Sequence, residues 1–262
     1  MTSAIQSGTG RRTSTGTSAA ISPQGLARIA GLLYLVVGIL GAFAFAAVYS
    51  TMYVAGNPAA SAGNLVANAG LVRVGVAADL IQVPVWVLLS LTLYALLKHV
   101  SAYAARAMIV LVAIGASLSF VNILFEFEGL RVATDATYIA AVGSAAANGL
   151  ALVMLDLQHY GYAIAGILFG LWLVPLGYLA WQSDMFPKAL GAALVVAGVS
   201  YLFDTLAAIV APGLTSIIHP LATILGIVAE VWTLGYLLVK GVRNPGATDV
   251  PRHASAPAPA GA

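Results

Sequence analysis

The stretch ALGAALVVAGVSYLFDTLAAIV, residues Ala189–Val210, decides the fold class of this chain. It is long enough to cross the hydrocarbon core of a bilayer as one α-helix, which takes about 20 apolar residues. Asp204 is the single charged residue in it. An acidic side chain at the centre of a bilayer costs about 2.5–3.5 kcal/mol on insertion scales. The stretch therefore predicts a transmembrane helix in which some role of Asp204 offsets this cost.

The composition of the whole chain agrees with this prediction. Of the 262 residues, 61% are hydrophobic and 8% are charged, whereas a soluble domain carries about 25% charged residues. We therefore expect an all-α protein, a polytopic transmembrane helical bundle that passes several times through the cell membrane. The absence of cysteine excludes disulfides and thiolate chemistry. The formal charge of +2 comes from scattered basic residues, so the lipid bilayer is expected as a partner and nucleic acid is not.

Six apolar runs have the length and polarity of membrane-spanning helices. They are Ile29–Val48, Val74–Leu97, Ala107–Phe127, Tyr160–Trp181, Ala189–Val210 and Ile217–Val239. Together they form a predicted transmembrane domain over residues 28–242. The flanking segments, 1–27 and 243–262, are rich in small polar residues or in proline and alanine. We expect both to be disordered cytoplasmic tails.

A seventh candidate span, Thr137–Leu155, is uncharged but rich in alanine and glycine. The distribution of basic residues argues against it. With six spans and both termini in the cytoplasm, nine of the 11 basic residues are cytoplasmic and only Arg73 and Arg131 lie outside, whereas seven spans would give five against six. The positive-inside rule therefore favours six spans. Residues 128–158 are then expected to form an outer segment, as a surface-lying or re-entrant helix.

Several polar side chains lie within the predicted spans or at their outer ends. Those within the spans are Asp79, Asn122, Glu126, Asp204 and Glu230, and those at or near the outer ends are Arg73, His159 and His219. Polar residues at one depth on several helices usually face a common interior or a water-filled cavity. We therefore predict an acidic cavity on the extracytoplasmic side, with the five interior residues and Arg73 as ligand-binding or proton-relay candidates. Arg73 is expected to act as a charge partner.

Five stretches of the chain resemble one known family. They are RIAGLLYLVVG (Arg28–Gly38), LVRVGVAADL (Leu71–Leu80), LQHYGYAIAGILFGLWLVPLGYLAW (Leu157–Trp181), VSYLFDTLA (Val199–Ala207) and AEVWTLGYLLVKG (Ala229–Gly241). In these stretches the chain is similar to domain-of-unknown-function family 4386, a group of bacterial integral membrane proteins. The resemblance implies a six-helix membrane fold without an assigned activity.

The resemblance also implies that some polar positions are shared with the family. These are an acidic residue at Asp79, a histidine near His159, an aspartate at Asp204 and a glutamate at Glu230. At the start of the fourth span, where the family has His-Asp-Tyr-Gly, this chain has Gln-His-Tyr-Gly from Gln158.

Three functions are compatible with these features. A proton- or ion-linked small carrier would use intramembrane carboxylates as a relay, but the sequence lacks the paired broken helices of many transporters. An intramembrane metal hydrolase would need three protein ligands. His159, His219 and a carboxylate lie at similar depth and are weak candidates, but the sequence has no HExxH motif. We therefore expect no metal or other cofactor. The favoured function is that of a non-enzymatic sensor, accessory component or binding protein for a small molecule or a proton.

The carboxylates and the glycines in the spans can also have purely structural roles. The buried carboxylates can serve only to hold helices together through hydrogen bonds. Gly166 and Gly170 form a small-xxx-small pair, which indicates close helix packing either within the chain or in a homo-oligomer.

Overall fold

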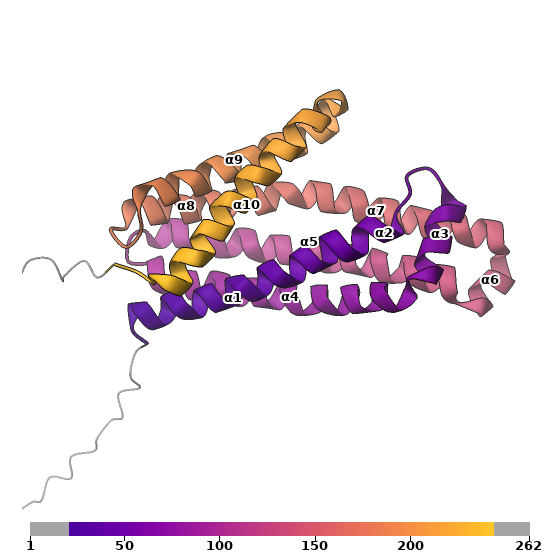
Figure 1. Cartoon of the computed structure of the whole chain (residues 1–262), viewed down its shortest axis with the longest axis horizontal. Helices are drawn as coiled ribbons and strands as arrows, with labels where there is room; N and C mark the ends of the chain where they lie inside the picture. The colour runs from indigo at the N-terminus through magenta and orange to yellow at the C-terminus, as the bar shows by residue number, and fades with distance from the viewer. Residues whose placement is uncertain (1–20, 244–262) are drawn as a thin grey trace, which may run out of the picture.

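The computed structural model describes residues 21–243, and every regular element in that range is a helix (Figure 1). The elements are α1 (Pro23–Phe43), the π-helix η1 (Ala44–Tyr49), α2 (Ser50–Met52), α3 (Pro58–Ala67), α4 (Ala69–Leu97), α5 (Ala102–Thr134), α6 (Ala136–Val142), α7 (Ser144–Leu171), α8 (Leu173–Gln182), α9 (Lys188–Val210), the 3-10 helix η2 (Pro212–Leu214) and α10 (Thr215–Val239). The predicted all-α class is confirmed. The predicted tails lie mostly outside the described residues.

Six helical stretches are long and apolar enough to cross a membrane within the described range. They are Pro23–Met52, Ala69–Leu97, Ala102–Thr134, Ser144–Gln182, Lys188–Val210 and Pro212–Val239. The six predicted runs are thus confirmed, and the chain is a multi-pass membrane protein. The first span begins earlier than predicted, because Ser22 caps α1 by accepting a hydrogen bond from Gly25 N and Pro23 occupies the first helical turn.

Consecutive spans are neighbours in the bundle, and the last span returns to the first. α1 packs on α4, α4 on α5, α5 on α7, α7 and α8 on α9, α9 on α10, and α10 on α1. The N–H of Val242 donates to Gln24 Oε1 at 3.2 Å, so the first and last spans meet where the described chain starts and ends. We name this side the terminal end, and the opposite side, with α3 and α6, the distal end (Figure 1).

The segment 128–158 differs from the expected surface-lying or re-entrant helix. α5 continues to Thr134, α6 follows, and α7 begins at Ser144 and runs without a break into the fourth span. α5 has 33 residues, or about 50 Å at 1.5 Å per residue, which exceeds a hydrocarbon core of about 30 Å. Two spans, Ala102–Thr134 and Ser144–Gln182, are therefore longer than the hydrocarbon core is thick. Alanine has the highest helix propensity, which explains why this alanine-rich segment continues its neighbours as helix.

Two apolar clusters fill the bundle, one toward each end. Members of the terminal cluster include Leu89, Leu93, Met108, Leu173 and Leu190, and members of the distal cluster include Val48, Leu65, Val72, Leu130 and Leu155. The fourth span is broken at Trp172, a member of the terminal cluster, which separates α7 from α8. Pro175 has no N–H for the carbonyl of Leu171, and the next bond, from Leu176 N to Trp172 O, is stretched to 3.4 Å.

Gly166 and Gly170 contact α9 of the same chain. A Cβ on Gly166 would lie 2.6 Å from Thr205 Oγ1, and one on Gly170 would lie 2.5 Å from the carbonyl oxygen of Gly198. The small-xxx-small pair therefore forms a close helix contact within the chain. A homo-oligomer stays a prediction, and its interface would have to use other residues.

Candidate functional site

A hydrogen bond between the first and second spans is the starting point of the site. Tyr49 Oη donates to Asp79 Oδ2 at 2.6 Å, and Asp79 is only 6% exposed. Tyr49 is the last residue of η1. A π-helical turn changes the direction of the side chains that follow it and occurs often at functional sites. The two helices are close here, since a Cβ on Gly75 would lie 2.8 Å from Val48 Cγ1.

The third span contributes Asn122 and Glu126, one helical turn apart. Asn122 is 3% exposed and Glu126 is fully buried. Neither the amide of Asn122 nor either carboxylate oxygen of Glu126 has a hydrogen-bond partner among the described residues. Asn122 fits because α7 has a glycine opposite, and a Cβ on Gly161 would collide with Asn122 Oδ1. Unpartnered buried polar groups are rare and cost about 1–3 kcal/mol each.

Tyr162 on α7 completes this group. Its ring centroid lies 5.6 Å from that of Tyr49, with the planes at 75°. Glu126 is within electrostatic range of Asp79 and adjoins Tyr49. We define Tyr49, Asp79, Asn122, Glu126 and Tyr162 as the distal acidic cluster. Four spans contribute to it, and three of its members, Asp79, Asn122 and Glu126, are predicted site residues that the structure brings together.

The distal acidic cluster is separated from the basic residues of the terminal end by about the thickness of a hydrocarbon core. Asp79 precedes Lys98 by 19 residues and Glu126 follows Arg106 by 20 residues. At 1.5 Å per residue both carboxylates are about 28–30 Å from the basic residues of the terminal end. This separation matches the thickness of the hydrocarbon core, which is about 30 Å.

Glu230 occupies a second site, closer to the middle of the membrane. Tyr34 Oη on α1 donates to Glu230 Oε2 at 3.0 Å. Tyr201 on α9 lies beside the same carboxylate and packs over Gly226, where a Cβ would collide with its hydroxyl. The Tyr34 ring also packs against Trp172, with centroids 6.0 Å apart. Glu230 is therefore held by the first and fifth spans at the level where the fourth span is broken.

Asp204 forms a third contact, with His219. Asp204 Oδ2 and His219 Nδ1 lie 2.8 Å apart and join α9 to α10. The Asp204 side chain is 15% exposed and that of His219 is 56% exposed. Asp204 Oδ1 is buried without a partner among the described residues. Asp79, Asp204 and Glu230 thus each have a different partner rather than sharing one contact.

Two tyrosines lie within electrostatic range of carboxylates from all three contacts, and we name the three contacts together with these tyrosines the polar interior. Tyr162 is within electrostatic range of Asp79, Glu126 and Glu230. Tyr201 is within range of Glu230, Tyr162 and Asp204. The sequence did not identify Tyr34, Tyr49, Tyr162 and Tyr201, because a tyrosine in an apolar run is also typical of packing. Their position inside the spans could have indicated a polar role, because a buried tyrosine hydroxyl usually needs a hydrogen-bond partner.

The remaining predicted residues lie outside this interior. Arg73 is exposed and forms no ion pair with a described residue. His159 is exposed and stacks on Tyr53 with centroids 4.8 Å apart. The hydroxyl of Tyr53 donates to Asp156 Oδ1 at 2.7 Å. Burial, followed by this hydrogen bond, raises the pKa of Tyr53 to about 12.

A zinc site is not assembled within residues 21–243. There, no group of three histidine, aspartate or glutamate side chains lies close enough together to hold a metal ion. His159 is occupied by its aromatic stack and His219 by Asp204. The geometry therefore gives no support to the metal hydrolase.

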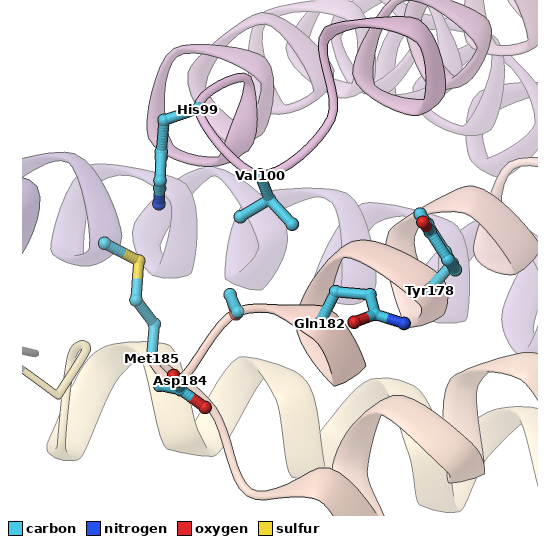
Figure 2. A pocket seen from close by; sticks show the side chains of 7 residues that line it. His99, Val100, Tyr178, Gln182, Asp184 and Met185 are labelled. Atoms are coloured by element: carbon cyan, nitrogen blue, oxygen red, sulfur yellow. The ribbon is translucent and has the colours of Figure 1, made fainter.

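Two cavities open at the terminal end, away from the predicted site residues. Figure 2 shows one of about 390 Å³, with His99, Val100, Tyr178, Gln182, Asp184 and Met185 around it. The other, of about 310 Å³, is lined by Tyr236, Lys240, Val242 and Arg243. The predicted carboxylates lie instead in buried contact networks between helices.

Comparison with known proteins gives the family. Residues 29–241 match the family model described as "Domain of unknown function (DUF4386)". No curated protein and no solved structure matches the chain. The matched region covers nearly all of the six spans and every residue of the polar interior, and it agrees with the resemblance of the five sequence stretches. The chain belongs to the DUF4386 family of membrane proteins.

Proposed function

We propose that this protein binds a proton, or a small cation in its place, at the distal acidic cluster, and that it acts as an ion-responsive sensor or accessory component of the cell membrane rather than as an enzyme. The observation that carries the proposal is Glu126, which is fully buried beside Asp79 and Tyr49, with neither carboxylate oxygen in a well-formed hydrogen bond to a described residue. Two nearby carboxylates in apolar surroundings repel each other strongly. A bound proton or cation removes this repulsion.

The oxygen atoms of the cluster fit such a ligand. Glu126 offers two free carboxylate oxygens and Asn122 offers an unpartnered amide oxygen. Asp79 accepts one hydrogen bond, from Tyr49, and a carboxylate can accept several. Carboxylate and carbonyl oxygens are the ligands that hard cations prefer. Because Glu126, Asn122 and Asp79 are at most 6% exposed, a proton or a bare ion fits the cluster better than an organic molecule does.

The packing below the polar interior favours sensing. The polar interior extends from the distal acidic cluster to Glu230, which Tyr34 binds. Toward the terminal end follow fully buried leucines, among them Leu89, Leu97, Leu173 and Leu190. Apolar packing of this kind offers no partner to a moving proton or ion. An ion that reaches the cluster from the distal end would therefore bind there without crossing the leucine packing. Such binding without transport suits a sensor.

A proton- or ion-linked carrier is the second candidate, because one feature supports it. The fourth span is broken at Trp172, with Pro175 in the following helix, and discontinuous spans are common where transporters bind their substrates. Glu230 lies at this level through Tyr34, which packs against Trp172. A carrier would need a second conformation in which the leucine packing opens.

Thermal melting of the purified protein in nanodiscs tests the binding proposal. A ligand that binds only the folded protein raises its melting temperature. We expect the wild type to melt at higher temperature as the concentration of protons or of sodium ions rises, and Glu126→Gln to lose this response. The matched control is Glu128→Gln, on the same helix but paired with Arg131 at 2.6 Å outside the cluster. An equal response in Glu126→Gln and wild type would contradict the proposal.

Ion flux in liposomes separates the two candidates. A wild-type protein that carries protons or sodium across the liposome membrane, and loses this flux with Asp79→Asn and Glu126→Gln combined, is a carrier. A protein that keeps the melting response and shows no flux is a sensor or an accessory component.

A further inference from the structure

The terminal end contains an open pocket with two basic side chains, Lys240 and Arg243, that the proposed ion site does not use. α10 ends at Val239, and the N–H groups of Lys240 and Gly241 both donate to Tyr236 O at 2.9 Å. Gly241 has φ +70°, the left-handed conformation that ends many helices. The chain then turns, and the N–H of Arg243 donates to Met185 O at 3.1 Å. These bonds fix the residues after α10 against the α8–α9 loop.

The pocket has a volume of about 310 Å³ and is lined by Tyr236, Lys240, Val242 and Arg243. The hydroxyl of Tyr236 donates to Met185 O at 3.3 Å, and its ring lies 5.6 Å from that of Phe186. The aromatic wall is therefore held in place by the neighbouring loop. Val242 is buried and is fixed to the first span by its bond with Gln24.

Two positive charges in this pocket are not neutralised by the described part of the chain. Lys240 and Arg243 are exposed, and neither forms an ion pair with a described carboxylate. Asp184 in the neighbouring loop is paired with Lys188 at 3.2 Å instead. Two basic side chains without an acidic partner line this pocket, and they favour an anionic ligand.

We propose that this pocket binds a phosphate-bearing anion, supplied by the headgroup of an anionic phospholipid at the terminal end. The guanidinium of Arg243 suits the planar, bidentate contact with phosphate oxygens, and the ammonium of Lys240 acts as a point charge. Basic pockets on the cytoplasmic side of membrane proteins bind such headgroups. Val239, 73% exposed just before Lys240, continues the apolar surface on which an acyl chain would lie.

Short-chain lipids test this site on the full-length protein in detergent. The probes are dihexanoyl-phosphatidylglycerol, dihexanoyl-phosphatidylcholine and inorganic phosphate, and binding is followed by melting temperature and by native mass spectrometry. The variant is Lys240→Gln with Arg243→Gln. The matched control, Lys98→Gln with Arg106→Gln, removes the same charge from exposed residues of the same end outside the pocket.

Phosphatidylglycerol should bind the wild type and the control alike, and the pocket variant about 30-fold more weakly, since each basic residue near an anionic surface contributes about fivefold. Native mass spectrometry gives this result even if the pocket variant melts lower on its own. Equal binding of phosphatidylcholine, or equal weakening in the control variant, would overturn the proposal. If inorganic phosphate binds as tightly as phosphatidylglycerol and only the pocket variant loses it, the phosphate site holds but its lipid source is refuted.

Discussion

Tyr49 supplies the hydrogen-bond donor for the buried carboxylate of Asp79 in the second span. The hydrogen bond between them, 2.6 Å from Oη to Oδ2, is the only one that Asp79 accepts from a described side chain. A hydrogen bond to a charged group contributes about 1.5–3 kcal/mol, and its loss leaves the buried partner unsatisfied. The π-helical turn that ends in Tyr49 is thus a local deviation that supplies the donor this carboxylate needs.

Replacing Tyr49 by phenylalanine tests this interaction. The ring and its edge contact with Tyr162 are kept, but Asp79 loses its donor. We expect the free energy of unfolding to fall by about 1–3 kcal/mol, measured by chemical denaturation in mixed micelles. In a double-mutant cycle, Asp79→Asn should cost less in the Tyr49→Phe background than in wild type. Tyr103→Phe, at a position that is 86% exposed, is the control, and equal effects of the two tyrosine substitutions would contradict the prediction.

The individual polar residues were easier to predict than their partners. Asp79, Asn122 and Glu126 were identifiable because charged and amide side chains are costly within an apolar run, and the structure buries all three. Which side chains face them depends on how each helix is rotated about its own axis. Single-span patterns do not contain that rotation, so the donor Tyr49 and the pairing of Asp204 with His219 were not predictable.

The contact between α7 and α9 shows how one pair of helices sets the distance between two spans. Gly170 faces the backbone of α9, where a Cβ would lie 2.5 Å from the carbonyl oxygen of Gly198. No side chain can move away to relieve this clash, because the opposing atom belongs to the backbone. Tyr201 lies on the face of α9 that Gly170 contacts, since a Cβ on Gly170 would lie 3.0 Å from Tyr201 Cβ. Tyr201 also lies beside Glu230. The small residue therefore also fixes one wall of the polar interior.

Gly170→Ala and Gly38→Ala should therefore have opposite effects on stability. The first forces α7 and α9 apart, and overpacking of this kind costs about 1–3 kcal/mol. The second places a methyl group where no atom lies within 4 Å, so the higher helix propensity of alanine should stabilise α1 by up to about 1 kcal/mol. Melting temperatures of both variants in the same detergent check this. A Gly170→Ala protein that melts like wild type would show that the close contact is absent in the membrane.

The two short distal helices differ in how their first turns respond to pH. Asp135 caps α6 by accepting the N–H of Thr137 at 2.8 Å, and this backbone hydrogen bond is the main reason why the pKa of Asp135 lies below its usual 3.8. Asn57 caps α3 in the same way at 3.0 Å but does not titrate. A lowered pKa means that the cap stabilises α6 at every pH above the usual value and is lost as pH falls through the lowered one.

Hydrogen exchange of the distal helices tests this difference. Below about pH 4, the amides of α6 should lose protection relative to their intrinsic exchange rates, whereas those of α3 should not. At neutral pH, Asp135→Ala should produce the same loss in α6 and leave α3 unchanged. Equal acid sensitivity of the two helices would show that the carboxylate of Asp135 does not control this end of the bundle.

At the scale of the whole molecule, the sequence was sufficient for the number of spans and insufficient for their lengths. Runs of about 20 apolar residues identify a membrane crossing whatever surrounds it, and all six were found. Within residues 128–158, the uncharged stretch Thr137–Leu155 was a candidate span that the positive-inside rule set aside, but neither pattern showed that the segment extends its neighbouring spans as helix. Helix length beyond the membrane depends on propensity and capping, which hydropathy does not measure.

The first and last spans meet at the terminal end. The orientation of the protein in the membrane therefore depends only on which side of the membrane this end faces. The positive-inside rule predicts that this terminal end is cytoplasmic. The chain has no cysteine, so one introduced cysteine is its only thiol. Ala140 lies exposed on α6 at the distal end, and His99 lies exposed in the α4–α5 connection at the terminal end.

In intact cells, a membrane-impermeant maleimide should label Ala140→Cys and leave His99→Cys unlabelled, because the bilayer separates the reagent from the terminal end. After permeabilisation both variants should react, which controls for the accessibility of each thiol. The reverse pattern would invert the orientation and move the distal acidic cluster to the cytoplasmic side, where it would respond to internal ions. Labelling of Ala140→Cys from outside would instead mean that the cluster responds to the external medium, and that the basic pocket at Lys240 and Arg243 faces the anionic inner leaflet.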